Sequence, residues 1–441
     1  MQTQFTPEQL ADPDIDTSNQ ILRKCVHCGF CTATCPTYVL LGDELDSPRG
    51  RIYLIKEMLE SGKPATPQVV KHVDRCLSCL SCMTTCPASV NYMHLVDHAR
   101  AYIQKTYRRP LIDRLLRMVI AWVLPNPNRF HAALKLAALG RPLAPLFRLA
   151  KPLRPVAAML DLAPSAGAEP EAGETRTVIP AEGNRIGRVA LLTGCVQPVL
   201  APHINDATIR LLTRLGVEVV VPPAQGCCGA LVHHMGRESD AHAAAKRNID
   251  AWIAEIDGEG LDAILINASG CGTTVKDYGH MLREDEAYAE KARRVSVLTN
   301  DISEYLDTFH IDAPADWKPL KVAYHSACSL QHGQKIQLAP KRLLIKAGFE
   351  VADIAEGHLC CGSAGVYNVL QPDIATQLRD RKIVNIQRVA PDLVATGNIG
   401  CMTQLGSGMS IPVVHTVELL DWVSGGPKPQ ALKNVEPNSI E

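Results

Sequence analysis

The chain has 441 residues, of which 46 % are hydrophobic and 21 % are charged, with 45 basic against 46 acidic side chains. The formal charge of −1 gives no global basic field, so we expect no nucleic-acid partner. The hydrophobic content excludes a disordered chain. The longest apolar stretch, residues 115–124, contains Arg117 and is too short to span a bilayer.

The cysteine content is the most informative feature of the composition. The first residues are polar and acidic and do not have the form of a secretory signal, so we expect a cytoplasmic protein. In a reducing compartment the 16 cysteines are not expected to form structural disulfides. Cysteines in that setting usually bind metal or carry out redox chemistry, and their spacing decides which.

The first eight cysteines form two runs with the same spacing, C-x2-C-x2-C-x3-C, each followed by proline. This is the bacterial [4Fe–4S] pattern, in which the fourth cysteine of each run ligates the other cluster. Zinc sites, the main alternative, seldom have a third cysteine at the same interval. We therefore expect two [4Fe–4S] clusters, one held by Cys25, Cys28, Cys31 and Cys86, and one held by Cys76, Cys79, Cys82 and Cys35. We also expect each fourth cysteine to begin a helix.

Between the two runs, residues 47–62 have helical periodicity, with Ser47 as the N-cap and Pro48 in the first turn. Arg49 and Arg51 lie in this helix. We expect both on a solvated helix face, and docking beside a cluster is the alternative.

Residues 100–160 contain twelve Arg and Lys side chains but a single acid, Asp113. Their leucine- and alanine-rich pieces predict short basic amphipathic helices interrupted by prolines. Two interpretations remain open. The helices attach to an anionic membrane surface or a partner subunit, or they form a hairpin packed on the neighbouring domains with arginines facing water. Residues 163–174 are small and polar and predict a linker.

The other eight cysteines form two matching sets about 130 residues apart, which indicates a duplicated domain. Each set has one cysteine, then a Cys-Cys-Gly triplet, then a last cysteine. The possible metal sites are Cys195, Cys227, Cys228 and Cys271 in the first copy, and Cys328, Cys360, Cys361 and Cys401 in the second. Each copy reads as alternating β-strands and helices, so we expect parallel α/β sheets with the cysteines beyond the carboxyl ends of the strands.

Five histidines lie near these cysteines, namely His233, His234, His325, His332 and His358. Local packing or bonding is the expectation for each, and iron ligation, donation to sulfur or proton relay are the alternatives. The sequence contains no G-x-G-x-x-G after a strand and no P-loop, so no flavin or nicotinamide site is expected on this chain.

The duplicated cysteine motifs resemble the cysteine-rich CCG family of heterodisulfide reductases, lactate-utilisation proteins and the third subunit of anaerobic glycerol-3-phosphate dehydrogenase. In heterodisulfide reductases the last element is CxxC, which implies five thiolates for a noncubane cluster. Thr274 and Gln404 occupy the corresponding positions here, so both fifth thiolates are absent. The resemblance therefore leaves a conventional cluster, or one degenerate copy, as the expectation.

The whole arrangement resembles the iron–sulfur subunits of glycolate oxidases, on the stretches KCVHCGFCTATCPTY, DSPRGRIYLIKEML and DRCLSCLSCMTTCPASV. This resemblance implies an electron-transfer subunit of a glycolate-oxidising complex. FAD would lie only on partner dehydrogenase subunits, the acceptor would be a quinone or another membrane carrier, and contact with the cytoplasmic membrane face would be peripheral. The alternatives are a thiol/disulfide enzyme, or the equivalent subunit of a glycerol-3-phosphate or lactate dehydrogenase.

The predicted fold is α+β and multidomain. We expect a helical ferredoxin-like 2[4Fe–4S] domain at 1–100, a basic connector and linker at 101–165, α/β CCG domains at 166–312 and 313–425, and a tail at 426–441.

Overall fold

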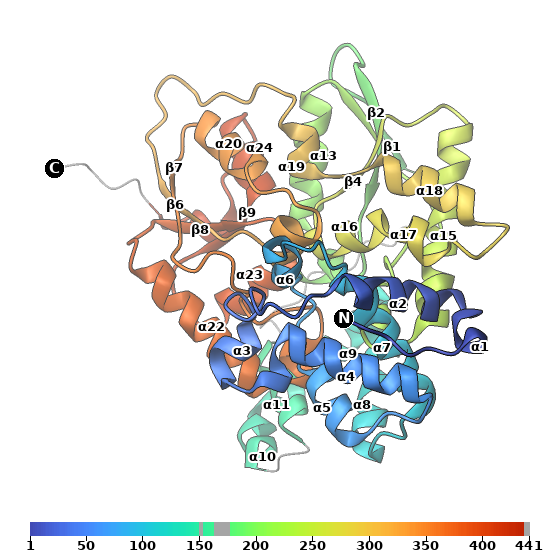
Figure 1. Cartoon of the computed structure of the whole chain (residues 1–441). Helices are drawn as coiled ribbons and strands as arrows, with labels where there is room; N and C mark the ends of the chain where they lie inside the picture. The colour runs from blue at the N-terminus through green and yellow to red at the C-terminus, as the bar shows by residue number, and fades with distance from the viewer. Residues whose placement is uncertain (150–152, 163–176, 436–441) are drawn as a thin grey trace.

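The computed structural model describes residues 1–149, 153–162 and 177–435. A helical N-terminal region and a helical connector lie on one side of two α/β units, each built on its own sheet (Figure 1). The predicted fold class is confirmed. The proposed linker at 163–174 lies outside the described residues.

Proline and capping side chains set the starts of the N-terminal helices. Proline occupies the first turn of five of them, where its missing N–H costs nothing. The predicted helix after Ser47 is confirmed, with the Gly50 N–H donating to Ser47 Oγ at 3.0 Å. The elements are α1 Pro7–Leu10, α2 Pro13–Lys24, α3 Pro36–Leu41, η1 Glu44–Asp46, α4 Pro48–Ser61, α5 Pro67–Asp74, α6 Ser81–Thr85 and α7 Tyr92–Thr106.

The connector is helical, as its amphipathic pattern predicts. Its elements are α8 Leu111–Val123, α9 Pro127–Gly140, η2 Arg141–Leu143, α10 Ala144–Leu149 and α11 Arg154–Leu162. Arg109 and Arg117 do not face water, because both bind Asp74 of α5, at 2.6 and 3.1 Å. The connector therefore packs on the neighbouring ferredoxin-like region, as the hairpin interpretation expects. The expectation that its arginines face water is wrong for Arg109 and Arg117.

The first α/β unit has a five-stranded sheet in the order β1-β3-β2-β4-β5. Strands β2, β3, β4 and β5 pair in parallel, as expected, and β1 is an antiparallel edge strand. The strands are β1 Thr177–Ile179, β2 Gly187–Leu192, β3 Val217–Val221, β4 Ala263–Ile266 and β5 Thr299–Asp301. The helices are α12 Gln197–Leu200, α13 His203–Arg214, α14 Ala230–His234, α15 Glu238–Asp257, α16 Ser269–Lys276, α17 Tyr278–Met281, α18 Ala289–Leu298 and α19 Ile302–Leu306.

The second unit repeats this plan with a fully parallel four-stranded sheet in the order β7-β6-β8-β9. Its strands are β6 Lys321–Tyr324, β7 Glu350–Ala352, β8 Leu393–Thr396 and β9 Val413–His415. Its helices are the π-helix η4 Ser329–Gly333, α20 Ala339–Lys346, α21 Tyr367–Leu370, α22 Pro372–Gln387, α23 Ile399–Gly406, α24 Thr416–Val423 and the terminal η5 Gln430–Leu432.

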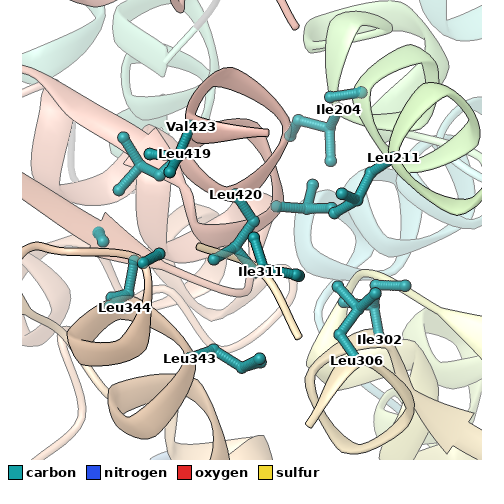
Figure 2. Packing of buried hydrophobic residues seen from close by; sticks show 14 of the residues in the cluster. Ile204, Leu211, Ile302, Leu306, Ile311, Leu343, Leu344, Leu419, Leu420 and Val423 are labelled. Carbon is teal, nitrogen blue, oxygen red and sulfur yellow. The ribbon is translucent and has the colours of Figure 1, made fainter. Parts of the chain in front are cut away.

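One hydrophobic core joins the two sheets. Val189 and Leu191 of β2 and Val322 and Tyr324 of β6 all face it, while the alternate residues face separate helical layers. Helices α13, α19, α20 and α24 fill the space between, and Figure 2 shows their leucine and isoleucine side chains meeting. Because both sheets bury one face in the same core, the two units are held in a fixed relation.

The carboxyl ends of the central strands β4 and β8 meet at this junction. The Ser269 N–H donates to the Gly397 carbonyl at 3.2 Å, and Asn398 Nδ2 donates to Ser269 Oγ at 3.0 Å. His415 Nε2 lies 2.8 Å from the Asn267 carbonyl. The helices that follow these strands, α16 and α23, carry Cys271 and Cys401 in their first turns, so this junction directs both cysteine sets to one place.

The glycine after each Cys-Cys pair allows a turn that a side chain would block. Gly362 has φ +90°, and a Cβ there would lie 2.4 Å from the Ala375 carbonyl oxygen. Gly365 also has positive φ, +64°, but a Cβ there would meet nothing within 4 Å.

We predict that Gly362→Ala destabilises the protein much more than Gly365→Ala. The left-handed backbone costs alanine about 1 kcal/mol at both positions, and the clash with helix α22 adds about 1–3 kcal/mol only at Gly362. Denaturant unfolding of the two variants measures the difference. Equal destabilisation of the two variants would show that the close approach of the backbone at Gly362 does not affect the free energy of unfolding.

Candidate functional site: four groups of cysteines

The structure brings the first cysteine group together around one pocket. Cys25, Cys28, Cys31 and Cys86 line it, together with Cys82. Cys86 belongs to the second sequence run, so its presence here matches the crossed arrangement expected for two-cluster ferredoxins. Burial raises the pKa of the Cys31 thiol to about 11. A bound metal must therefore supply the charge that keeps this sulfur deprotonated. The ligand assignment itself stays a prediction.

The second group lies deeper in the helical region. Cys35, Cys76, Cys79 and Cys82 are all buried. Cys35 caps α3, as expected of a fourth cysteine, but Cys86 is followed by a turn, and α7 begins only at Tyr92. The expectation that both fourth cysteines begin a helix is therefore wrong for Cys86. Burial raises the pKa of the Cys79 and Cys82 thiols well above the usual value.

Arg51 is the functional side chain that sequence reasoning misplaced. It is 1 % exposed, and its Nη1 lies 3.8 Å from Cys35 Sγ, so the expected solvated face is wrong for this residue. Its partners are the Thr37 hydroxyl at 2.9 Å and the His72 carbonyl at 2.6 Å. Arg49, on the same helix, pairs with Glu44 and also lines the pocket of the first cysteine group. Helical periodicity places the two arginines on different faces but does not say which face is buried.

The Asp46 carboxylate explains why a cation can be buried here. Asp46 is fully buried and binds Arg51 Nη2 at 3.3 Å, His72 Nδ1 at 2.9 Å and Arg75 Nη1 at 2.7 Å. The guanidinium is thus paired on one side and directed at a cysteine on the other.

The third and fourth groups are the two CCG sets, each gathered beyond the ends of its strands as predicted. In the first set, Cys195 Sγ lies 3.5 Å from Cys227 Sγ, and in the second, Cys328 Sγ lies 3.7 Å from Cys360 Sγ. Hydrogen bonds from Cys195 and Cys228 hold the pKa of the Cys227 thiol well below its usual value. Hydrogen bonds from Cys360 and Cys401 do the same for Cys361.

Sulfur separations of this size fit ligands that share one metal centre. Four sulfurs at about 2.3 Å from a tetrahedral ion lie about 3.8 Å apart. The donor set, four cysteines with one thiol of low pKa, is that of zinc or iron. Both CCG sets are therefore chemically able to hold a metal ion.

A cavity of about 330 Å³ lies between the two CCG sets. Cysteines of both sets line it, and apolar side chains of the connector close it from the other side. The connector residues are Ile120, Val123 and Leu124 around α8, Phe130, Ala133, Leu134 and Ala137 on α9, and Met159 on α11. Sequence reasoning did not find this cavity, because it depends on how the connector folds across both repeats.

The ferredoxin-like region contacts the second CCG set. Cys79 and Leu77 share a buried hydrophobic cluster with Cys360 and Tyr367, and Cys328 packs against it. The Cys328 thiol is among the charges that raise the pKa of Cys79, after burial itself. A continuous path of buried contacts therefore joins the second ferredoxin group to the second CCG set.

Four of the five histidines considered above are explained locally, and one is not. His233 and His234 face Asp97 of α7, at 3.3 and 3.7 Å. His332 binds the Thr84 hydroxyl at 2.7 Å and the His358 carbonyl at 3.1 Å, which fixes the ferredoxin-like region to η4. The His358 side chain is half-exposed. His325 is buried beside Cys361 and Cys401.

Family comparisons define the class of protein. A 4Fe-4S dicluster domain profile matches residues 21–90, and a CCG cysteine-rich domain profile matches residues 189–276 and 322–406. The chain is therefore a dicluster iron–sulfur protein with two CCG repeats. The Escherichia coli (strain K12) glycolate oxidase iron-sulfur subunit is 44 % identical over 421 residues, 96 % of this chain and 98 % of that protein. The chain belongs to the family of glycolate oxidase iron–sulfur subunits.

Other proteins are also similar to this chain. The probable glycolate oxidase iron-sulfur subunit of Bacillus subtilis (strain 168) is 32 % identical over 90 % of this chain and 93 % of its own. Lactate utilization protein A of Geobacillus thermodenitrificans (strain NG80-2) is 28 % identical, over 53 % of this chain and 98 % of its own. A crystal structure of a hypothetical protein from Helicobacter pylori shares the fold, with a TM-score of 0.54 at 10 % identity over 96 % of this chain and 74 % of that one.

We predict that Arg51→Leu lowers the free energy of unfolding by about 3–5 kcal/mol, because it leaves the buried Asp46 carboxylate with less compensating charge. Arg49→Leu, on the same helix, is the matched control, and its exposed ion pair contributes less than about 1 kcal/mol. Denaturant unfolding of the cluster-loaded protein under anaerobic conditions measures both. Similar losses for the two variants would contradict a special role for Arg51.

Proposed function

We propose that the chain relays electrons within a complex that oxidises glycolate to glyoxylate. The two electrons and two protons of that oxidation would leave the substrate at a flavin on partner FAD-binding subunits, since this sequence has no flavin fingerprint. Two relatives that match nearly the whole chain are named as glycolate oxidase subunits, whereas lactate utilization protein A matches about half of this chain. This difference favours glycolate over lactate as the substrate of the complex.

The observation that carries the proposal is the order of the cysteine groups in space. The first group lies in a pocket at the surface, and it includes the exposed Cys28. The second group is buried behind it, and the second CCG set follows in direct contact. We infer that electrons enter at the first ferredoxin site and move inward along this line. Ligation of the first cluster by Cys25, Cys28, Cys31 and Cys86, and of the second by Cys76, Cys79, Cys82 and Cys35, is part of the proposal.

The acceptor that best suits the inner end of this line is a quinone. A quinone ring is flat and apolar and needs two electrons and two protons to become a quinol. The cavity between the CCG sets is mainly apolar in its lining, and it has thiols of both sets in its wall. Pockets of about this volume hold small organic ligands in many proteins.

Peripheral membrane attachment through the connector would give that quinone a way in. Helices α8, α9 and α10 carry large apolar side chains that are exposed, among them Leu139 at 79 % and Trp122 at 59 %. The others are Leu111, Ile112, Leu115, Met118, Val119, Leu136, Leu143, Leu146 and Leu149. Basic residues of the same segment lie among them, which suits an anionic lipid surface.

The geometry of the connector supports this attachment. In Figure 1 the labels for α8, α10 and α11 lie at the end of the molecule away from both sheets. Helices α8 and α9 line the cavity with one face and carry exposed leucines on another. Among the described residues, no helix has both the length and the apolar character needed to cross a bilayer.

The relay predicts that glycolate reduces both ferredoxin-like clusters when the FAD-binding subunits are present. We expect about eight iron atoms per chain from these two clusters, and paramagnetic signals that appear within one turnover of added glycolate. Lactate and glycerol 3-phosphate are the comparison substrates. Zinc in place of iron at these sites, or glycolate oxidation at the full rate after the clusters are removed, would refute the relay.

The cavity and the exposed face predict different effects from two changes in the same helix, α9. Ala137→Phe narrows the cavity and should lower quinone reduction about tenfold or more, while reduction of a soluble dye by the ferredoxin clusters stays unchanged.

Leu136→Ser with Leu139→Ser should weaken binding to anionic vesicles about tenfold or more, because each buried leucine contributes about 1.5–3 kcal/mol. Vesicle sedimentation and steady-state rates measure the two effects. Unaltered vesicle binding together with loss of a co-purifying subunit would assign this face to a partner protein instead.

A further inference from the structure

His325 distinguishes the second CCG set from the first. It follows β6 and precedes Cys328 by three residues, and its backbone N–H donates to the Ala395 carbonyl of β8 at 2.8 Å. This bond fixes the residue at the carboxyl end of the two central strands. The residue is only 2 % exposed, so its ring cannot reach solvent.

The imidazole ring of His325 is buried beside Cys361 and Cys401. Within the part of the chain that the structure describes, neither Nδ1 nor Nε2 makes a hydrogen bond of ordinary geometry, and the ring interacts instead with the nearby Cys361 thiol. Leaving a buried polar atom without a partner costs about 1–3 kcal/mol, so such a ring calls for an explanation. One ring nitrogen, Cys361 Sγ and Cys401 Sγ all lie within 4.8 Å of one another.

Other buried histidines in this half of the protein do not share this property. His332 binds Thr84 and the His358 carbonyl. His415 binds the Asn267 carbonyl through Nε2 and accepts from the Val417 N–H through Nδ1. Burial alone therefore does not account for the lack of an ordinary hydrogen bond at the His325 ring.

The first repeat has no equivalent nitrogen. The position three residues before its first cysteine is Leu192, which is buried in the hydrophobic layer behind β2. The polar residue three positions after the last cysteine of the first repeat is Thr274, and its hydroxyl donates to the Gly270 carbonyl at 3.4 Å.

We propose that His325 is a nitrogen ligand of a metal centre in the second CCG set, together with Cys328, Cys360, Cys361 and Cys401. This inference rests on the proposed binding of metal by the CCG sets. The first set offers four thiols and no imidazole, so the two repeats hold centres with different ligands. Mixed thiolate and imidazole donors suit iron or zinc, and a zinc ion would take His325 and three of the four thiolates.

The added imidazole gives the second centre a distinct electronic character. An imidazole is a neutral ligand, unlike a thiolate, and histidine ligation raises the reduction potential of iron–sulfur centres relative to cysteine alone. The second set is also the one that contacts the buried ferredoxin group. If its metal is iron, the centre next to the ferredoxin clusters is thus the easier of the two CCG centres to reduce.

The test uses the full chain purified anaerobically with its partner subunits and labelled with 15N-histidine. We expect a nitrogen coupling in pulsed paramagnetic resonance if the metal is iron, or a nitrogen scatterer in zinc-edge X-ray absorption if it is zinc. His325→Leu, which copies Leu192 of the first repeat, should remove this signal and release most of the metal of one site. His325→Cys should retain the metal and lose the nitrogen signal.

His358→Leu is the matched control, because it removes a nearby histidine outside the cluster, and it should keep both metal and signal. Thermal unfolding and the two ferredoxin signals verify that each variant is folded. A wild-type protein whose iron is fully accounted for by the ferredoxin clusters and that holds no zinc would overturn the inference, as would unchanged metal and nitrogen signal in His325→Leu. Glycolate-driven reduction of the ferredoxin clusters, recorded in the same samples, tests the relay separately.

Discussion

The structure depends on the junction between the carboxyl ends of β4 and β8. Hydrogen bonds from Ser269 and Asn398 join the two turns, and the core shared by both sheets prevents the units from rotating apart. In parallel sheets, ligand-binding loops gather beyond the carboxyl ends of strands. Bringing two such ends together therefore places seven cysteines, drawn from both repeats, around one cavity.

The neighbours of the buried charged groups and thiols explain their burial and their pKa values. The Arg51 guanidinium is buried because Asp46 pairs with it, and the same side chain then faces Cys35. Burial raises the pKa of the Cys82 thiol, whereas hydrogen bonds from neighbouring cysteines lower the pKa of the Cys227 and Cys361 thiols. A site that binds metal needs both properties, namely protection from solvent and at least one sulfur that is ready to lose its proton.

The connector contacts both the cavity between the CCG sets and the ferredoxin-like region. Its inner side chains close the cavity, its arginines at 109 and 117 bind Asp74 of the ferredoxin-like region, and its outer leucines are exposed. The sequence left attachment and packing as alternatives because an amphipathic period shows one apolar stripe and does not say what covers it. In the folded chain, one apolar face of α8 and α9 lines the cavity and further apolar side chains of the same helices are exposed, so packing and an exposed apolar face coexist.

The sequence by itself determined the chemistry of the sites and the class of the fold. Cysteine spacing is local, and so are the alternation of strands and helices and the repeat period, so residues such as Cys25 or Cys360 could be recognised without neighbours in space. Only the tertiary structure decided which group contacts which, that Arg51 is buried, and that His325 faces Cys361 while Leu192 stands in its place in the first repeat. These facts depend on contacts between residues far apart in the chain, and a linear pattern carries no information about the partner that packing supplies.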